Sequence, residues 1–136
     1  MDSFRDLVVW QKAMLLATDV YRTTLTFPRS EVYGLASQMQ RAAVAVPSDI
    51  AEGKGRLSKK EFVQMLSRGR GSLQELDTQI EIAKNLGYLQ PDVSARLSTQ
   101  CDEVGRLLNG LLRSIQTQID THEHPRRTTP RDRKDS

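Results

Sequence analysis

The chain has 136 residues, which favours a single domain, and its 38% hydrophobic and 27% charged residues are typical of a soluble globular protein. The single cysteine, Cys101, excludes an intrachain disulfide, and the formal net charge of +3 is compatible with binding a polyanion without requiring it. Asp2 and Asp6 interrupt the N-terminal apolar residues, and no apolar run approaches the length needed to span a membrane. We therefore expect a cytoplasmic protein that does not contact the membrane.

The first predicted helix carries two apolar stripes. Apolar residues at positions 7, 10, 14, 17 and 21 have the spacing of one helix face. The helix should end near Phe27, because Pro28 disfavours helical geometry in the residue before it. The second stripe lies about 120–140° around the same helix and consists of Val9, Ala13, Leu16, Val20 and Phe27.

The second predicted helix contains a proline. Ser30 is expected to cap it, with Glu31 in its first turn. Its inward stripe consists of Leu35, Met39, Ala42, Val46 and Ile50. Pro47 lies within this stripe and predicts a kink, not an end, because the apolar period resumes beyond it. Gly53 or Gly55 is expected to supply the left-handed residue that closes the helix.

The third and fourth predicted helices have regular apolar patterns. Residues 58–61, Ser-Lys-Lys-Glu, are typical of a capping box. The third stripe follows in heptads and consists of Phe62, Met65, Gly69, Leu73, Leu76, Ile80 and Ala83. This helix should end near Gly87, and Pro91 should occupy the first turn of the fourth helix. The fourth stripe consists of Val93, Leu97, Cys101, Val104, Leu108, Leu111 and Ile115.

These helices predict one fold. Four amphipathic segments with short connections favour an all-α, antiparallel up-down-up-down four-helix bundle over residues 1–120, with a kinked second helix. Beyond Asp120 the apolar period is lost, which predicts a disordered basic tail over residues 121–136.

No motif indicates a phosphate loop, a metal site or a nucleophile. The Gly-Lys-Gly of residues 53–55 lacks the Walker spacing and follows a helix, which indicates a corner between two helices. His122 and His124 lie in the predicted tail without a third ligand, so no metal site is expected. Cys101 occupies an inward position and is interpreted as a small apolar core residue.

One pair of carboxylates has the residue types that acid–base chemistry uses. Asp49 and Glu52 are three residues apart and share a helix face, but no obvious proton acceptor or pocket accompanies them. We interpret them as solvated acids or as part of a structural joint beside Pro47. The sequence therefore predicts neither enzymatic activity nor a cofactor nor a small-molecule substrate.

Positive charge is concentrated in residues 41–70, which contain seven bases and three acids. We expect the bases to gather where the second and third helices meet; they are Arg41, Lys54, Arg56, Lys59, Lys60, Arg68 and Arg70. Such a cluster binds phosphates in a salt-sensitive, mostly sequence-blind manner, and no interleaved aromatic residue indicates base stacking. Contact with RNA or DNA and simple solvation of a helix surface both remain open.

An uncharged second seam on the second helix indicates self-association. It consists of Tyr33, Gln40, Val44, Pro47 and Ala51. Together with Val9, Ala13, Leu16 and Val20 of the first helix, these residues form the predicted oligomer interface, since one bundle cannot bury every apolar face. The alternative is a wide-faced helix inside the monomer.

Three blocks of the sequence resemble one known family. RAAVAVPSDIAEGKGRLSKKEF, GSLQELDTQIEIAKNLGYL and the opening FRDLVVWQKAMLLATDVY are similar to the 23S ribosomal RNA intervening-sequence proteins. The resemblance covers residues 4–115. It implies a small bacterial four-helix bundle that assembles into a ring, a homopentamer, and that has no established enzymatic activity.

The resemblance also bears on nucleic acid. The family looks related to accessory proteins of diversity-generating retroelements, basic bundles thought to contact nucleic acid, which implies polyanion contacts at Arg41, Lys54 and Arg56. This sequence departs from the family pattern at Gln40, where arginine is common, and at Asp49, where asparagine is usual. Both departures reduce local positive charge.

Overall fold

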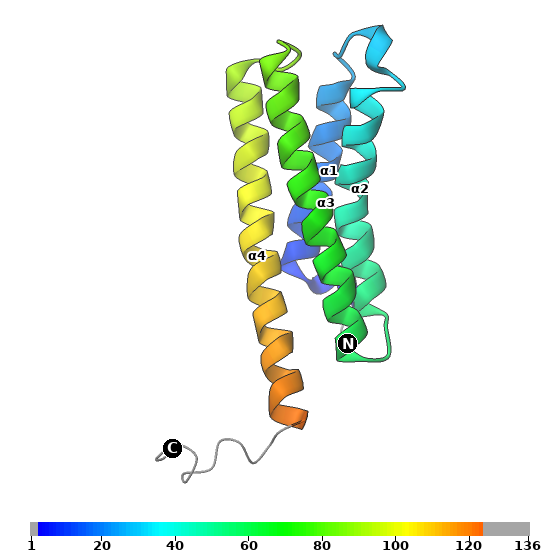
Figure 1. Cartoon of the computed structure of the whole chain (residues 1–136), viewed down its shortest axis with the longest axis vertical. Coiled ribbons are helices and arrows are strands. Elements are labelled where there is room, and N and C mark those ends of the chain that lie inside the picture. The colour runs from blue at the N-terminus through cyan, green and yellow to red at the C-terminus, as the bar shows by residue number, and fades with distance from the viewer. Residues whose placement is uncertain (1–2, 124–136) are drawn as a thin grey trace.

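The computed structural model describes residues 3–123 as four long helices, with no strand in that range (Figure 1). The elements are the 3₁₀ turn η1 (Phe4–Asp6), α1 (Val8–Thr24), the 3₁₀ turn η2 (Arg29–Glu31), α2 (Leu35–Lys54), α3 (Lys59–Asn85) and α4 (Pro91–Glu123). Successive helices run up, down, up and down, so the all-α bundle prediction is confirmed.

The core forms because each helix turns one apolar stripe inward. Helix α1 packs on α2 and α4, and α3 packs on the same two neighbours. The largest fully buried side chains come from all four helices and are Leu16, Val20, Met39, Val46, Ile50, Leu66, Leu76, Ile80, Leu97, Val104 and Leu108. The predicted inward stripes of α2, α3 and α4 supply most of these residues and are confirmed.

The helix ends differ from prediction in their chemistry. Helix α2 begins later than expected, with Gly34 at its N-cap; the carboxylate of Glu31, and not the hydroxyl of Ser30, accepts the backbone N–H of Leu35 at 2.8 Å. The prediction that α2 continues through Pro47 is confirmed.

The left-handed glycine lies in a different place from the one predicted. Gly55, at the C-cap of α2, has φ −83°, and Gly53 is a buried helical residue, so neither is left-handed. Among the described residues the one glycine with positive φ is Gly87 (φ 79°), which follows α3. Helix α4 begins at Pro91 as expected but ends at Glu123, so residues 121–123, predicted to belong to a tail, are helical. The rest of the predicted tail, residues 124–136, lies outside the described residues.

Helix α1 is turned differently from the prediction. Its presumed interface stripe of Val9, Ala13, Leu16 and Val20 is buried within the chain. The stripe that includes Met14 and Tyr21 is the partly exposed one. Both stripes are apolar, so the period alone cannot select the inward one. Two exposed ion pairs to α4 accompany this rotation of α1: Lys12 Nζ lies 3.5 Å from Glu103 Oε2, and Arg96 Nε lies 3.0 Å from Asp19 Oδ2.

Candidate functional site

An uncharged groove runs between the outer faces of α1 and α2. Its volume is about 550 Å³, and its lining consists of Trp10, Met14, Ala17, Thr18, Tyr21, Val44, Pro47, Ser48 and Ala51. The side chains of Met14, Tyr21 and Val44 are between 39% and 45% exposed. One turn beyond Tyr21 and Val44, Gln40 Nε2 donates a hydrogen bond to Thr24 Oγ1 at 2.9 Å and joins the two walls. We call this feature the α1–α2 groove.

The groove follows from helical spacing. Its wall on α1 is a stripe at intervals of three and four residues, and its wall on α2 is another, so both walls are single helix faces. The predicted interface residues Val44, Pro47 and Ala51 do line this groove, whereas Tyr33 precedes α2 and is 96% exposed. The predicted α1 residues Val9, Ala13, Leu16 and Val20 do not line the groove, because they are in the core. The α1 wall of the groove is formed by the other apolar stripe, which includes Trp10, Met14 and Tyr21.

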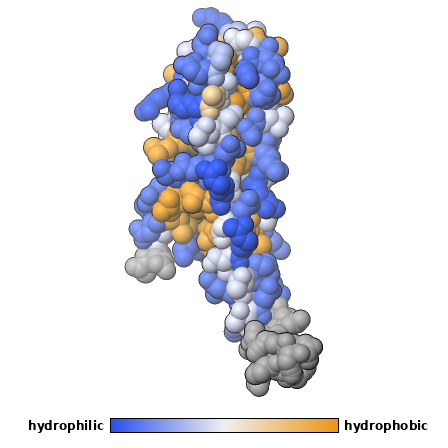
Figure 2. All heavy atoms as spheres, turned by 90° about the vertical axis from the view of Figure 1, so that its left-hand side faces the viewer, coloured by the Kyte–Doolittle hydropathy of each residue, from blue (hydrophilic) through white to orange (hydrophobic). Residues whose placement is uncertain are grey.

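A second apolar surface lies on the other flank of α1. Val8 and Leu15 are more than half exposed there. Figure 2, which views the molecule from the side of α4, shows hydrophobic residues gathered in the lower half of this otherwise mostly polar face. On α4, Leu107 and Leu111 are half-buried against the core. We call Val8, Leu15, Leu107 and Leu111 together the α1–α4 flank.

Four of the seven predicted basic residues meet at one end of the bundle. Lys54 ends α2, Arg56 lies in the connection, and Lys59 and Lys60 begin α3. We call these four residues the basic corner. Lys54, Arg56 and Lys59 line a cavity of about 440 Å³, whose apolar lining includes Phe62. Lys59 and Lys60 line a second cavity of about 710 Å³.

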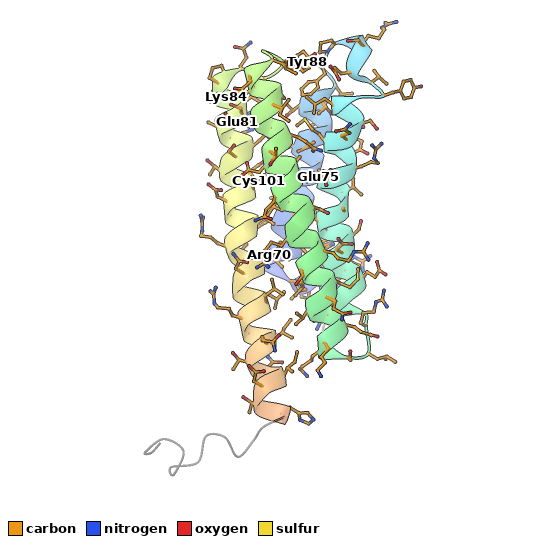
Figure 3. The ribbon with its side chains drawn as sticks, in the orientation of Figure 1. Arg70, Glu75, Glu81, Lys84, Tyr88 and Cys101 are labelled. Carbon is orange, nitrogen blue, oxygen red and sulfur yellow. The ribbon has the colours of Figure 1, made fainter. Side chains whose placement is uncertain are left out.

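The other three basic residues are spread along the bundle, so the prediction that all seven converge is wrong. At 1.5 Å per residue, Arg41 lies about 20 Å along α2 from Lys54. Arg68 is directed toward the thioether of Met65, and the guanidinium of Arg70 donates to Asn109 Oδ1 on α4 at 3.1 Å. Figure 3 shows Arg70 well above the lower end of α3.

The two candidate carboxylates do not act as a pair. Asp49 is buried where α2 approaches Gly69 of α3. Burial raises the pKa of the Asp49 carboxyl; the charge of Arg68 opposes this rise and the charge of Glu52 adds to it. Glu52 is exposed and bonds to the guanidinium of Arg56 at 2.6 Å. The interpretation of Asp49 as a solvated acid is therefore wrong.

The remaining candidate groups offer no obvious chemistry. Cys101, labelled in Figure 3, is buried, and burial together with Asp77 and Asp102 raises its pKa to about 12. Its thiol therefore stays protonated at neutral pH. Within residues 3–123 no three His, Cys, Asp or Glu side chains are grouped so as to hold a metal ion. His122 lies exposed in the last turn of α4, and His124 falls outside the described residues.

A clamp that no sequence pattern predicts joins the two loops at the other end of the bundle. Besides capping α2, the carboxylate of Glu31 accepts the hydroxyl of Tyr88 at 2.9 Å. The Tyr88 ring packs on Phe27, with ring centroids 5.3 Å apart, and Figure 3 shows Tyr88 where α3 joins α4. Glu31 and Tyr88 are 57 positions apart, so no local pattern connects them.

The clamp predicts a change in stability with pH. The Leu35 N–H first, and the Tyr88 hydroxyl second, lower the pKa of Glu31 from its ordinary 4.5. The stabilisation is therefore complete above about pH 4.5 and is lost as the pH falls through the folded-state pKa. Tyr88→Phe keeps the ring but removes one hydrogen bond, so the free energy of unfolding should change less between about pH 7 and pH 3 than in the wild type. Urea unfolding at both pH values measures this, and an unaltered difference would contradict the clamp.

Comparison with known proteins identifies the family. The chain matches the 23S rRNA-intervening sequence protein family over residues 5–110, which is most of its length and all of α1, α2 and α3. The chain belongs to this family. The resemblance carried by the three sequence blocks is therefore confirmed. The residues of the α1–α2 groove and of the basic corner all lie within the matched range.

A solved structure shows the same fold. The crystal structure of a protein of unknown function from the S23 ribosomal protein family of Bacteroides thetaiotaomicron superposes with a TM-score of 0.70 at 17% sequence identity, covering 77% of this chain and 98% of that one. At this identity the likeness establishes the bundle and not a role. No curated protein matches the chain. Among the described residues of this family member, no helix combines the length and the apolar character that crossing a membrane requires.

Proposed function

We propose that this 23S rRNA-intervening sequence protein is a non-enzymatic homo-oligomer, a ring-forming scaffold or accessory protein whose subunits associate through the α1–α2 groove. The groove carries this proposal, because none of its nine lining residues is charged and several are large and apolar. The number of subunits, five, comes from the family resemblance and not from the groove.

Solvent exposure of the groove is unfavourable in a monomer. Exposed apolar grooves that gather several large side chains commonly mark interaction sites. Trp10, Met14 and Tyr21 are also residue types that are enriched where proteins meet. A second copy of the chain is a partner that is present wherever the protein is made.

A charge placed in the groove tests the proposal. Val44→Glu puts a carboxylate on an exposed helical position, so helicity should be retained while the assembly disperses, because the interface would have to bury an unpaired charge. Gln38→Glu introduces the same negative charge at an exposed position of α2 outside the groove and should leave the assembly intact. Light scattering and circular dichroism of both variants measure this. Unchanged association of the Val44 variant would contradict the proposal.

A second candidate function is binding of RNA or DNA phosphates at the basic corner. Four cationic residues from the end of one helix and the start of the next, beside two cavities, favour it. Affinity should fall with salt and with alanine at Lys54, Arg56, Lys59 and Lys60 together. A control quadruple alanine variant with the same net charge has its substitutions at Arg22, Arg29, Lys84 and Arg106, which are exposed and line neither cavity of the corner. Gel shifts in which both variants lose binding equally would reject a site at the corner.

A further inference from the structure

Helix α1 stops short at the end of the bundle that carries the basic corner. Lys12 of α1 pairs with Glu103 of α4, so these two residues lie at the same level of the antiparallel helices. At 1.5 Å per residue, α1 begins at Val8, about 6 Å beyond that level, whereas α4 continues to Glu123, about 30 Å beyond it. Figure 1 shows α3 and α4 extending below the start of α1. At this end, three helices therefore surround a space that no fourth helix fills.

The cavity of about 440 Å³ at the basic corner lies in this space, and we call it the end cup. Its apolar lining comes from the residue before α1, from the α2–α3 connection, from the first turn of α3 and from α4; it consists of Leu7, Leu57, Phe62, Leu111 and Ile115. The volume is within the range of about 300–1,000 Å³ that is usual for small-molecule sites, which occur in bundles between the helices.

The polar lining of the end cup is positively charged. Lys54, Arg56 and Lys59 are its charged members, and no acidic residue lines the cup. Glu52 pairs with Arg56 at 2.6 Å from outside the lining, whereas Lys59 makes no ion pair within the part of the chain that the structure describes. The end cup therefore combines an apolar wall with a cationic wall, which is the arrangement that an amphipathic anion requires.

We infer that the end cup binds a small organic phosphate monoester, with the phosphate at Lys54, Arg56 and Lys59 and the apolar body against Phe62 and Ile115. Such a phosphate carries a charge of about −1.5 to −2 at pH 7 and three accepting oxygens, so it matches several cations better than a carboxylate does. The inference does not depend on self-association. It differs from sequence-blind contact with RNA or DNA because it requires an apolar body on the ligand.

Calorimetric titration with four ligands tests which parts of the ligand are recognised. 1-Naphthyl phosphate has the head and the body, inorganic phosphate has the head alone, and 1-naphthol has the body alone. 1-Naphthyl phosphate should bind at least about tenfold more tightly than either, because it alone combines buried apolar surface with charged contacts. 1-Naphthoate, which has a single charge, should bind more weakly than 1-naphthyl phosphate.

A charge variant tests the position of the phosphate. Arg56→Ala combined with Lys59→Ala should weaken binding of 1-naphthyl phosphate by about tenfold or more, since charged hydrogen bonds are lost, and should leave 1-naphthol binding unchanged. Arg29→Ala combined with Lys84→Ala removes the same net charge at exposed positions that line neither cavity of the basic corner. This control should leave both affinities unchanged.

A filling variant tests the position of the apolar body. Ser114 is an exposed residue of α4 that lines the end cup, so Ser114→Trp should place a large ring there and abolish binding of 1-naphthyl phosphate and of 1-naphthol. Gln116→Trp introduces the same ring at an exposed position of α4 outside the lining and should bind both ligands as the wild type does.

The outcomes separate this inference from phosphate binding by the basic corner. Equal affinities for inorganic phosphate and 1-naphthyl phosphate would overturn the inference and leave an electrostatic surface that the second candidate function can use. Equal affinities for 1-naphthoate and 1-naphthyl phosphate would overturn the assignment of a phosphate. Full affinity in the Ser114 variant, or no binding of 1-naphthyl phosphate to the wild type, would overturn the end cup as the site, while gel shifts with RNA would report on the corner separately.

Discussion

Leu16→Glu is expected to unfold the bundle, whereas Leu15→Glu is expected to leave it folded. Leu16 is 1% exposed and Leu15, its neighbour in the same helix, is 61% exposed. Even truncating a buried leucine to alanine costs about 2–5 kcal/mol, which is a large part of a total stability of about 5–15 kcal/mol. A buried carboxylate without a partner adds a desolvation cost, so the Leu16 variant should lose most of its helicity.

The two leucine variants are matched in residue type, helix and introduced charge. Circular dichroism and urea unfolding should show wild-type helicity for Leu15→Glu and a free energy of unfolding within about 0.5 kcal/mol of the wild type's, as is usual for surface changes. Similar losses of helicity in both variants would mean that the orientation assigned to α1 is wrong.

Gly53→Ala is expected to destabilise the monomer where α2 packs on α3. A Cβ at Gly53 would lie 2.8 Å from Phe62 Cδ1 and 2.9 Å from Met65 Cβ, closer than such atoms normally approach. Overpacking of this kind costs about 1–3 kcal/mol, offset by about 1 kcal/mol from the better helix propensity of alanine. Urea unfolding should therefore show a net loss.

Gly71→Ala is the matched control. A Cβ there meets no atom within 4 Å, and the residue is exposed in the interior of α3. The same chemical change should raise the free energy of unfolding by about 0.5–1 kcal/mol. If both variants were stabilised alike, the close approach of α2 and α3 at Gly53 would be contradicted.

The regular helices were predictable because each has one dominant apolar stripe. In α3 and α4 the heptad positions, such as Leu76 and Leu108, are buried, and the helix ends follow from the chemistry of Gly87 and Pro91. Helix α2 was predictable through Pro47, because the apolar period continues on both sides of it. In these helices local pattern and tertiary packing agree.

Helix α1 and the candidate sites depended on contacts that the sequence does not show. Two apolar stripes compete in α1, and only the assembled bundle shows that the stripe of Val9, Ala13, Leu16 and Val20 is the buried one. The sequence therefore predicts the α2 wall of the groove, which includes Val44 and Ala51, but selects the wrong stripe of α1 for the other wall. Arg41 and Arg70 lie close to the basic corner in the sequence but not in space, and sequence spacing alone does not show the difference.

The mass of the native protein in solution tests the central claim most directly. Native mass spectrometry across a dilution series down to micromolar concentration should show one closed species at a fixed multiple of the 15.4 kDa chain, five copies if the family resemblance gives the ring number. A single 15.4 kDa species throughout the series would contradict self-association through the α1–α2 groove.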